Sequence, residues 1–205
     1  MGNGTIPGPI GYEGGARLDD GTLALTRSPS PAPIGLSGKG TSAKGGAASL
    51  AAEIVSYARN RMGQVVGNGE CFTLVDRALR NAGARSAADY AEVTPAADYE
   101  WGTSISLAEL AAGDLIQFRD YQCDVETESA TEVGSETQTR PHHTAIVESV
   151  ADHGVVTVLE QNIPPGTGVT RHRLYFTSGT WTTGTATIRA TVRGTFWFYR
   201  AQPAP

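Results

Sequence analysis

The chain has 205 residues, of which 40% are hydrophobic and 18% charged, and its formal net charge is −5 at pH 7. This length is sufficient for one well-packed domain with a tail, and the composition is typical of a folded globular protein. The negative net charge argues against general nucleic-acid binding, and the apolar stretches are too short to span a membrane.

Residues 1–46 form a separate compositional zone that is rich in Gly, Pro, Ser and Thr. Such a segment buries too little apolar surface to offset the entropy lost on ordering, so a flexible N-terminal segment is predicted. Two interpretations stay open, namely a plain tail or linker and a leader, adaptor or delivery segment. The first residues lack a basic region followed by an apolar core, so no cleavable signal peptide is expected. We therefore expect a soluble protein of unknown location, with secretion by a signal-independent route left open.

Two amphipathic helices are predicted at the start of the folded domain, which we place at residues 47–202. Apolar residues recur at helical spacing over Leu50–Met62, which indicates the first helix. The Gly67–Gly69 segment interrupts this pattern. A second helix is predicted over Phe72–Ala82, with Gly83 as its C-terminal signal.

Beyond the helices the sequence alternates with the period of β-strands, and five strands are predicted. They span Leu115–Phe118, His143–Val150, Gly154–Asn162, Val169–Phe176 and Thr187–Arg200. Helices followed by such an antiparallel meander predict an α+β domain, with N-terminal helices packed on an antiparallel β-sheet.

A polar insertion, residues 119–141, separates the first two predicted strands and carries six acidic residues against two arginines. We expect this acidic insertion to be a loop. It is either a lid or a docking surface for a basic partner, or else a solvated loop without a partner.

The two cysteines, Cys71 and Cys123, imply no disulfide framework. Cys71 begins the second predicted helix, where the free N–H groups and the helix dipole favour a thiolate. Taken alone this is weak support for a nucleophile, because buried inert cysteines are common. Cys123 lies in the acidic insertion and is expected to be a free, exposed thiol, with a disulfide to Cys71 as a redox-switch alternative.

His143 is the candidate base for this thiolate. It opens a predicted strand and shares a face with Ala145, where a small side chain would let a helix approach closely. The adjacent His142 is the rival candidate, but it falls out of phase and at the edge of the insertion. Hairpin pairing with the next strand sets Glu160 opposite His143, where a carboxylate fixes the tautomer of the imidazole. Asn162 shares the face of Glu160.

A metal site is not expected. His142 and His143 are adjacent, so a strand would send them to opposite faces, and no further His or Cys stands at zinc-like spacing. His153 and His172 are expected in a turn and on a strand surface. No phosphate-cradling glycine motif is present, so no cofactor is predicted.

Four segments, in this order, resemble the successive motifs of CHAP domains, which are amidase and peptidase modules of the NlpC/P60 group with a papain-like fold. These segments are Gly69–Val75, Gly113–Phe118, His143–Val147 and Glu160–Asn162, and the last strand, Gly194–Arg200, is similar to the closing strand of that family. The resemblance covers roughly residues 48–200. It implies an α+β, papain-like NlpC/P60 fold.

The resemblance also implies a role for each matching residue. Cys71 attacks an amide carbonyl, and His143 passes the proton to the leaving amine. Glu160 orients His143, with Asn162 in the same network, and an acyl-enzyme forms that water resolves. The backbone N–H of Cys71 is one oxyanion donor, and Gln64 is a candidate for the second.

Three functions follow as hypotheses. The first is cleavage of peptidoglycan stem peptides or cross-bridges by a wall hydrolase or toxin, with an immunity or delivery protein as a further partner. The second is a protease, deamidase or acyltransferase that acts on a protein, and the third is a non-catalytic binding module. Two departures from CHAP domains bear on substrate preference. Phe72 stands where many members have Trp, and Glu70 precedes the nucleophile, where a carboxylate raises the thiol pKa unless it points away.

Overall fold

The structure is a computed structural model, and it describes residues 47–131 and 133–205. The flexible segment predicted for residues 1–46 lies outside the described residues. The helices are α1 (Ala47–Arg59) and α2 (Cys71–Ala82), and short 3-10 turns occur at Ala87–Asp89, Leu107–Glu109 and Asp152–Gly154. The strands are β1 (Thr103–Ile105), β2 (Leu115–Glu128), β3 (Val133–Ala151), β4 (Val155–Glu160), β5 (Thr170–Tyr175), β6 (Gly179–Thr183) and β7 (Ala186–Arg200).

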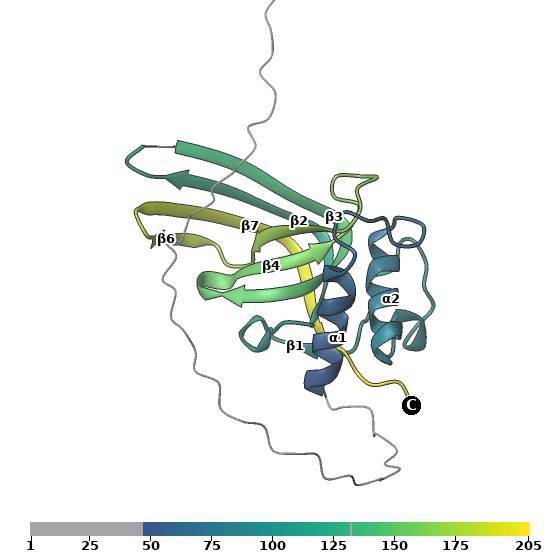
Figure 1. Cartoon of the computed structure of the whole chain (residues 1–205). Helices are drawn as coiled ribbons and strands as arrows, with labels where there is room; N and C mark the ends of the chain where they lie inside the picture. The colour runs from purple at the N-terminus through teal and green to yellow at the C-terminus, as the bar shows by residue number, and fades with distance from the viewer. Residues whose placement is uncertain (1–46, 132) are drawn as a thin grey trace, which may run out of the picture. The chain divides into compact units, whose positions relative to one another are not determined.

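The strands of the described residues form one antiparallel sheet in the order β1-β7-β2-β3-β4-β5, with β6 paired to β7. The predicted α+β class is confirmed, and α1 and α2 lie together at one end of the sheet (Figure 1). The simple meander is wrong, because the last long strand returns to pair between β1 and β2. The short strands β1 and β6 were not predicted.

The helices form where the apolar periodicity predicts them. In α2 the side chains of Leu74, Val75 and Leu79 are fully buried. This helix ends at Gly83, whose φ of 75° is left-handed and whose N–H donates to the carbonyl of Arg80. The buried face of α2 and its defined end at Gly83 hold the helix in place, and with it Cys71 as its first residue.

Strand alternation divides the buried side chains into two clusters. Ile146 packs in the cluster that contains the helices. Its neighbours Ala145 and Val147 pack in the second cluster, which contains no residue of α1 or α2. The idea that a small residue at 145 admits a helix is therefore wrong, because Ala145 faces away from both.

The acidic insertion is not a loop. β2 and β3 continue through it as paired strands, from the Tyr121–Arg140 pair to the Glu128–Val133 pair, and β7 pairs along the other edge of β2. Figure 1 shows this hairpin projecting away from the helices, beside β6 and β7. Its side chains alternate, with Val125 buried and Glu126 exposed. The acidic composition hid a period-two pattern, because charged residues occupy the solvent face of the strand.

Cys123 is buried in this hairpin, with 0% exposure, so the expectation of an exposed thiol is wrong. Its neighbours along the strand at alternate positions, Tyr121 and Val125, are buried in the same cluster. Burial raises the pKa of Cys123. Both cysteines are free, so Cys123 forms no disulfide with Cys71.

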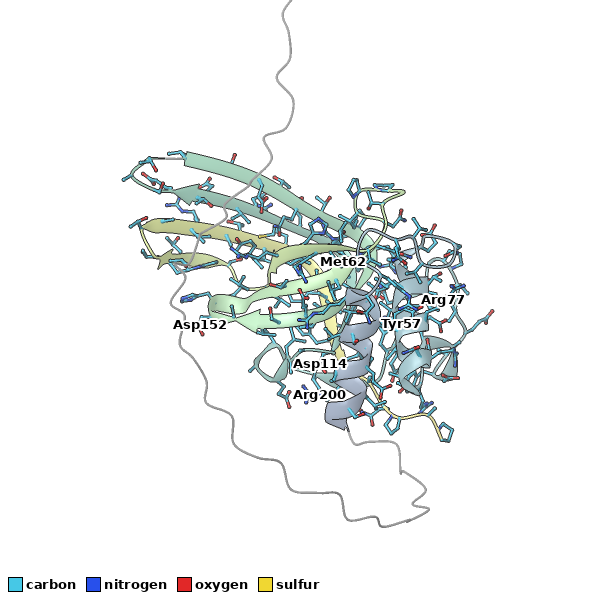
Figure 2. All side chains as sticks on the ribbon, viewed as in Figure 1. Tyr57, Met62, Arg77, Asp114, Asp152 and Arg200 are labelled. Atoms are coloured by element: carbon cyan, nitrogen blue, oxygen red, sulfur yellow. The ribbon has the colours of Figure 1, made fainter. Side chains whose placement is uncertain are left out.

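An ion pair joins the end of β7 to the residue that precedes the neighbouring strand β2. Arg200 at the end of β7 donates from Nε to Oδ1 of Asp114 (3.0 Å) and from its NH2 group to Oδ2 (2.9 Å). The two side chains lie next to each other beside α1 in Figure 2. Among the described residues, no helix is both long and apolar enough to cross a membrane.

Candidate active site

Cys71 is the first residue of α2, and a buried amide holds the segment in front of it. Gln161 accepts the N–H of Val66 at Oε1 (2.9 Å) and donates from Nε2 to the carbonyls of Val66 (3.0 Å) and Glu70 (2.7 Å). These hydrogen bonds tie the start of α2 to the end of β4. Gln161 lies within the Glu160–Asn162 motif, but its role was not predicted from the sequence.

The thiol of Cys71 and the imidazole of His143 lie close enough that each shifts the pKa of the other. Burial by itself would raise the pKa of Cys71, but the interaction with His143 and the backbone N–H groups of Thr144 and Phe72 lower it. Burial would lower the pKa of His143, but Cys71 and Glu160 outweigh it and raise the pKa to about 9. The two shifts together favour a thiolate that faces an imidazolium, the reactive form of a cysteine nucleophile.

The other ring nitrogen of His143 faces Glu160. Nε2 lies 2.8 Å from Oε2 of Glu160, and the two side chains are 4% and 0% exposed. A proton on Nε2 is poorly aligned with that oxygen, so the contact is better described as an ion pair than as a directed hydrogen bond. Since Nε2 is occupied in this way, Nδ1 is the nitrogen left for Cys71.

The register that brings Glu160 to His143 differs from the predicted one. Ile146 pairs with Leu159, and this register, continued by one residue, sets Glu160 two positions away from His143. The turn between β3 and β4 is centred on His153, whose φ is 60°, and a register shift between Val147 and Ser149 changes the pairing again. Beyond that shift the offset from the predicted register is two, which keeps His143 and Glu160 on their predicted face, so the two groups still meet diagonally.

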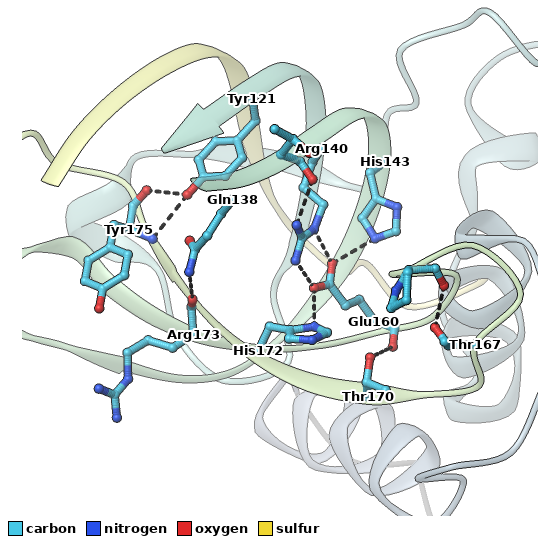
Figure 3. A network of polar contacts seen from close by, with 12 residues as sticks. Tyr121, Gln138, Arg140, His143, Glu160, Thr167, Thr170, His172, Arg173 and Tyr175 are labelled. Atoms are coloured by element: carbon cyan, nitrogen blue, oxygen red, sulfur yellow. Dashed lines mark hydrogen bonds and ion pairs between the residues drawn. The ribbon is translucent and has the colours of Figure 1, made fainter. Parts of the chain in front are cut away.

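Glu160 has two further partners, which the sequence did not predict (Figure 3). Arg140 donates from Nε to Oε2 at 2.9 Å and from its NH2 group to Oε1. Nδ1 of His172 lies 2.8 Å from Oε1, so His172 is part of this network and not only a strand-surface residue. Burial by itself would raise the pKa of Glu160, but His143, His172 and Arg140 hold it well below its ordinary value.

Residues 42–203 match the family model of the AIM3/BBC1 cysteine proteinase-fold domain. The chain belongs to this family. The match covers well over half of the chain and includes Cys71, His143 and Glu160. Neither the curated proteins nor the solved structures gave a match. Membership establishes a cysteine proteinase fold, whereas the finer assignment to CHAP or NlpC/P60 domains has only the resemblance of the motifs behind it.

In this AIM3/BBC1 domain, Cys71 and His143 line a cleft of about 530 Å³. Tyr99 and apolar side chains form one wall, and Glu70 also lines the cleft. His142 lies at this cleft too, where its Nε2 is 2.8 Å from the carbonyl oxygen of Ala97, so it is a wall residue and does not compete with His143. A larger cavity of about 700 Å³ lies beside α1, but it contains neither member of the Cys71–His143 pair.

Two predicted site residues lie elsewhere in the AIM3/BBC1 domain. Asn162 follows the end of β4 with a φ of 70°, so strand alternation no longer directs its side chain. Its Nδ2 donates to Oε2 of Glu70 (3.3 Å), and its Oδ1 accepts the N–H of Gly166 (2.7 Å), so it does not support His143. Gln64 is exposed and does not line the cleft. The predicted role of Asn162 as a support of His143 and that of Gln64 as an oxyanion donor are therefore both wrong.

Metal binding was not predicted for this chain. Within residues 47–131 and 133–205, no group of three or more His, Cys, Asp or Glu side chains is arranged to hold a metal ion.

Proposed function

We propose that this domain is a cysteine amidase or peptidase that cleaves the amide bond of a peptide through an acyl-enzyme. The observation that carries the proposal is the buried His143, which interacts with Cys71 at the cleft and whose Nε2 lies 2.8 Å from Oε2 of Glu160. A nucleophile, a base and a group that orients the base form the minimum set for such chemistry. Cys71 and His143 line one cleft, and Glu160 is buried beside His143.

The reaction then proceeds in two steps. The thiolate of Cys71 attacks the carbonyl carbon, and the C–N bond breaks as the imidazolium of His143 donates its proton to the leaving amine. This leaves a thioester on Cys71. A water molecule then attacks the thioester as His143 accepts a proton from it, and the C–S bond breaks. The carboxylic acid leaves, and the thiolate of Cys71 and the imidazolium of His143 are regenerated.

The negative oxygen that forms in each step needs two hydrogen-bond donors. The backbone N–H of Cys71 is one, because the first N–H groups of a helix have no acceptor within the helix. Asn68 takes the place that the sequence gave to Gln64, since it lines the same cleft as Cys71. Its Oδ1 accepts the N–H of Glu70 (3.1 Å) and the hydroxyl of Thr73 (2.5 Å), which leaves its Nδ2 without a partner among the described residues.

The cleft lining supports a peptide as the substrate. Apolar side chains of Val93, Pro95 and Phe72 can accept a side chain next to the scissile bond, and Glu70 adds a negative charge at the same cleft. Among the residues that the structure describes, no lysine or arginine lines this cleft, so substrates with a cationic group near the bond are favoured over acidic ones. The family description does not mention peptidoglycan, so wall peptides and proteins are both kept as substrates to be tested.

Mass spectrometry of digests tests this proposal. Purified peptidoglycan and a mixture of unfolded proteins are each incubated with the wild type, Cys71→Ala, His143→Ala and, as a thiol control, Cys123→Ala. Products that appear with the wild type and Cys123→Ala, and with neither of the other two, would support the proposal and identify the bond cut. Equal silence from all four, on both substrates, would favour the non-catalytic binding module.

A further inference from the structure

Glu160 has more positive partners than an orienting group requires. Besides His143, it contacts Arg140 through both of its oxygens and His172 through Oε1. The side chains of Glu160 and Arg140 are 0% and 5% exposed. Charges buried to this degree are weakly screened by water, so they act strongly on the groups beside them.

We propose that Arg140 is a positioning residue that neutralises Glu160, so that His143 is oriented by an ion pair of zero net charge and not by a free carboxylate. This inference rests on the function proposed above, in which His143 gives up and takes back a proton. A free buried carboxylate would hold that proton on the imidazole and hinder its transfer to the leaving amine. A neutral Arg140–Glu160 pair keeps the acceptor oxygen in place and removes most of this penalty.

The groups that set the charge on His143 come from four elements. Cys71 of α2 and Glu160 of β4 face the imidazole. His143 and Arg140 of β3 and His172 of β5 face the carboxylate. His172 is 36% exposed, so water screens it far more than Arg140. Among these groups, Arg140 is thus the permanent buried cation whose loss should change the field at His143 most.

Four proteins separate the charge of the pair from its packing: the wild type, Glu160→Gln, Arg140→Met and the double variant. The pKa of His143 is measured from the ¹⁵N resonances of its imidazole, which needs no substrate. Glu160→Gln leaves Arg140 uncompensated and should lower the pKa by about one unit or more, and Arg140→Met should raise it by a similar amount. In the double variant both charges are gone, and the pKa should return to within about half a unit of the wild-type value.

A control uses a second buried carboxylate, which lies on the same sheet. Glu148 is 5% exposed and pairs with Arg171 and Arg59, away from the Cys71 cleft. Arg171→Met removes an arginine from a glutamate in the same way, so it should leave the pKa of His143 unchanged. A shift in this control equal to that in Arg140→Met would mean that the effect is structural, and would overturn the proposal.

The double variant gives the decisive result. If its His143 pKa is as low as that of Glu160→Gln alone, the bare charge of Glu160 sets the pKa and the proposal is wrong. If Arg140→Met does not fold, Arg140→Lys takes its place. Lysine retains the positive charge, so the pKa of His143 should stay near its wild-type value. A shift of the His143 pKa by about one unit in Arg140→Lys would refute the neutral pair. If the four proteins show the expected His143 pKa values but the wild type hydrolyses no substrate, only the proposed function is rejected.

Discussion

Nε2 of His143 lies 2.8 Å from Oε2 of Glu160, and these two side chains, almost fully buried, come from the neighbouring strands β3 and β4. Because His143 lies within β3 and Glu160 is the last residue of β4, their relative position is set by the sheet and not by a loop. Cys71 is brought to the same histidine by α2, whose start is held by Gln161. The geometry therefore depends on contacts between sheet and helix that can be altered one at a time.

Asn68 is expected to contribute to catalysis, whereas Gln64 is not. Asn68→Ala should reduce kcat by roughly 100-fold, in the range seen when one oxyanion donor is removed. Alkylation of Cys71 should be little changed, since no oxyanion forms in that reaction. Gln64 is exposed and lies outside the cleft, so Gln64→Ala is the matched control and should retain the wild-type kcat. A steady-state assay on the substrate found by mass spectrometry compares them, and equal activity of the two variants would refute the role of Asn68.

Gln161 is expected to be a structural support of the nucleophile. Gln161→Leu removes three hydrogen bonds and leaves buried backbone groups unsatisfied, so the free energy of unfolding should fall by roughly 3 kcal/mol. Chemical denaturation followed by circular dichroism measures this change. Gln64→Leu makes the same substitution on the surface and should change stability by less than about 0.5 kcal/mol. A similar loss in both variants would contradict the assigned support.

The acidic hairpin is expected to behave as part of the folded sheet. Val125 is 3% exposed, so Val125→Asp buries an unpaired carboxylate and should lower the free energy of unfolding by roughly 3 kcal/mol or more. The adjacent Glu126 faces solvent, and Glu126→Gln should change it by less than about 0.5 kcal/mol. Were the hairpin a solvated loop, the two variants would melt alike in thermal denaturation.

The elements closest to Cys71 were predictable because their signals are local. The helix over Phe72–Ala82 follows from apolar spacing and from Gly83, and the structure confirms it. The shared face of His143 and Glu160 follows from strand alternation, which survived an error of two residues in register. Because side chains alternate every two residues, an even error in register leaves His143 and Glu160 on the same face, whereas an odd error would have placed them on opposite faces.

The partners of Glu160 were not predictable in the same way. Alternation along a strand sends Arg140 and His143 to opposite faces, yet both contact Glu160. At this level Asp120 of β2 has a φ of 52° and pairs with no residue of β3, and the β2–β7 register shifts between Arg119 and Gln122. Composition also concealed the hairpin, since its acidic residues suggested a loop although Tyr121, Cys123 and Val125 are buried at alternate positions of β2.

The rate of alkylation of Cys71 by iodoacetamide as a function of pH, in the wild type and in His143→Ala, tests the central claim most directly. Peptide mapping by mass spectrometry separates Cys71 from the buried Cys123. Because the pKa of Cys71 is lowered from 9.0 chiefly by His143, the wild type should keep its thiolate, and react, well below that pH, and the inflection should move back toward 9.0 in His143→Ala. One inflection near 9.0 in both proteins would show that His143 does not activate the thiol, and would contradict the account.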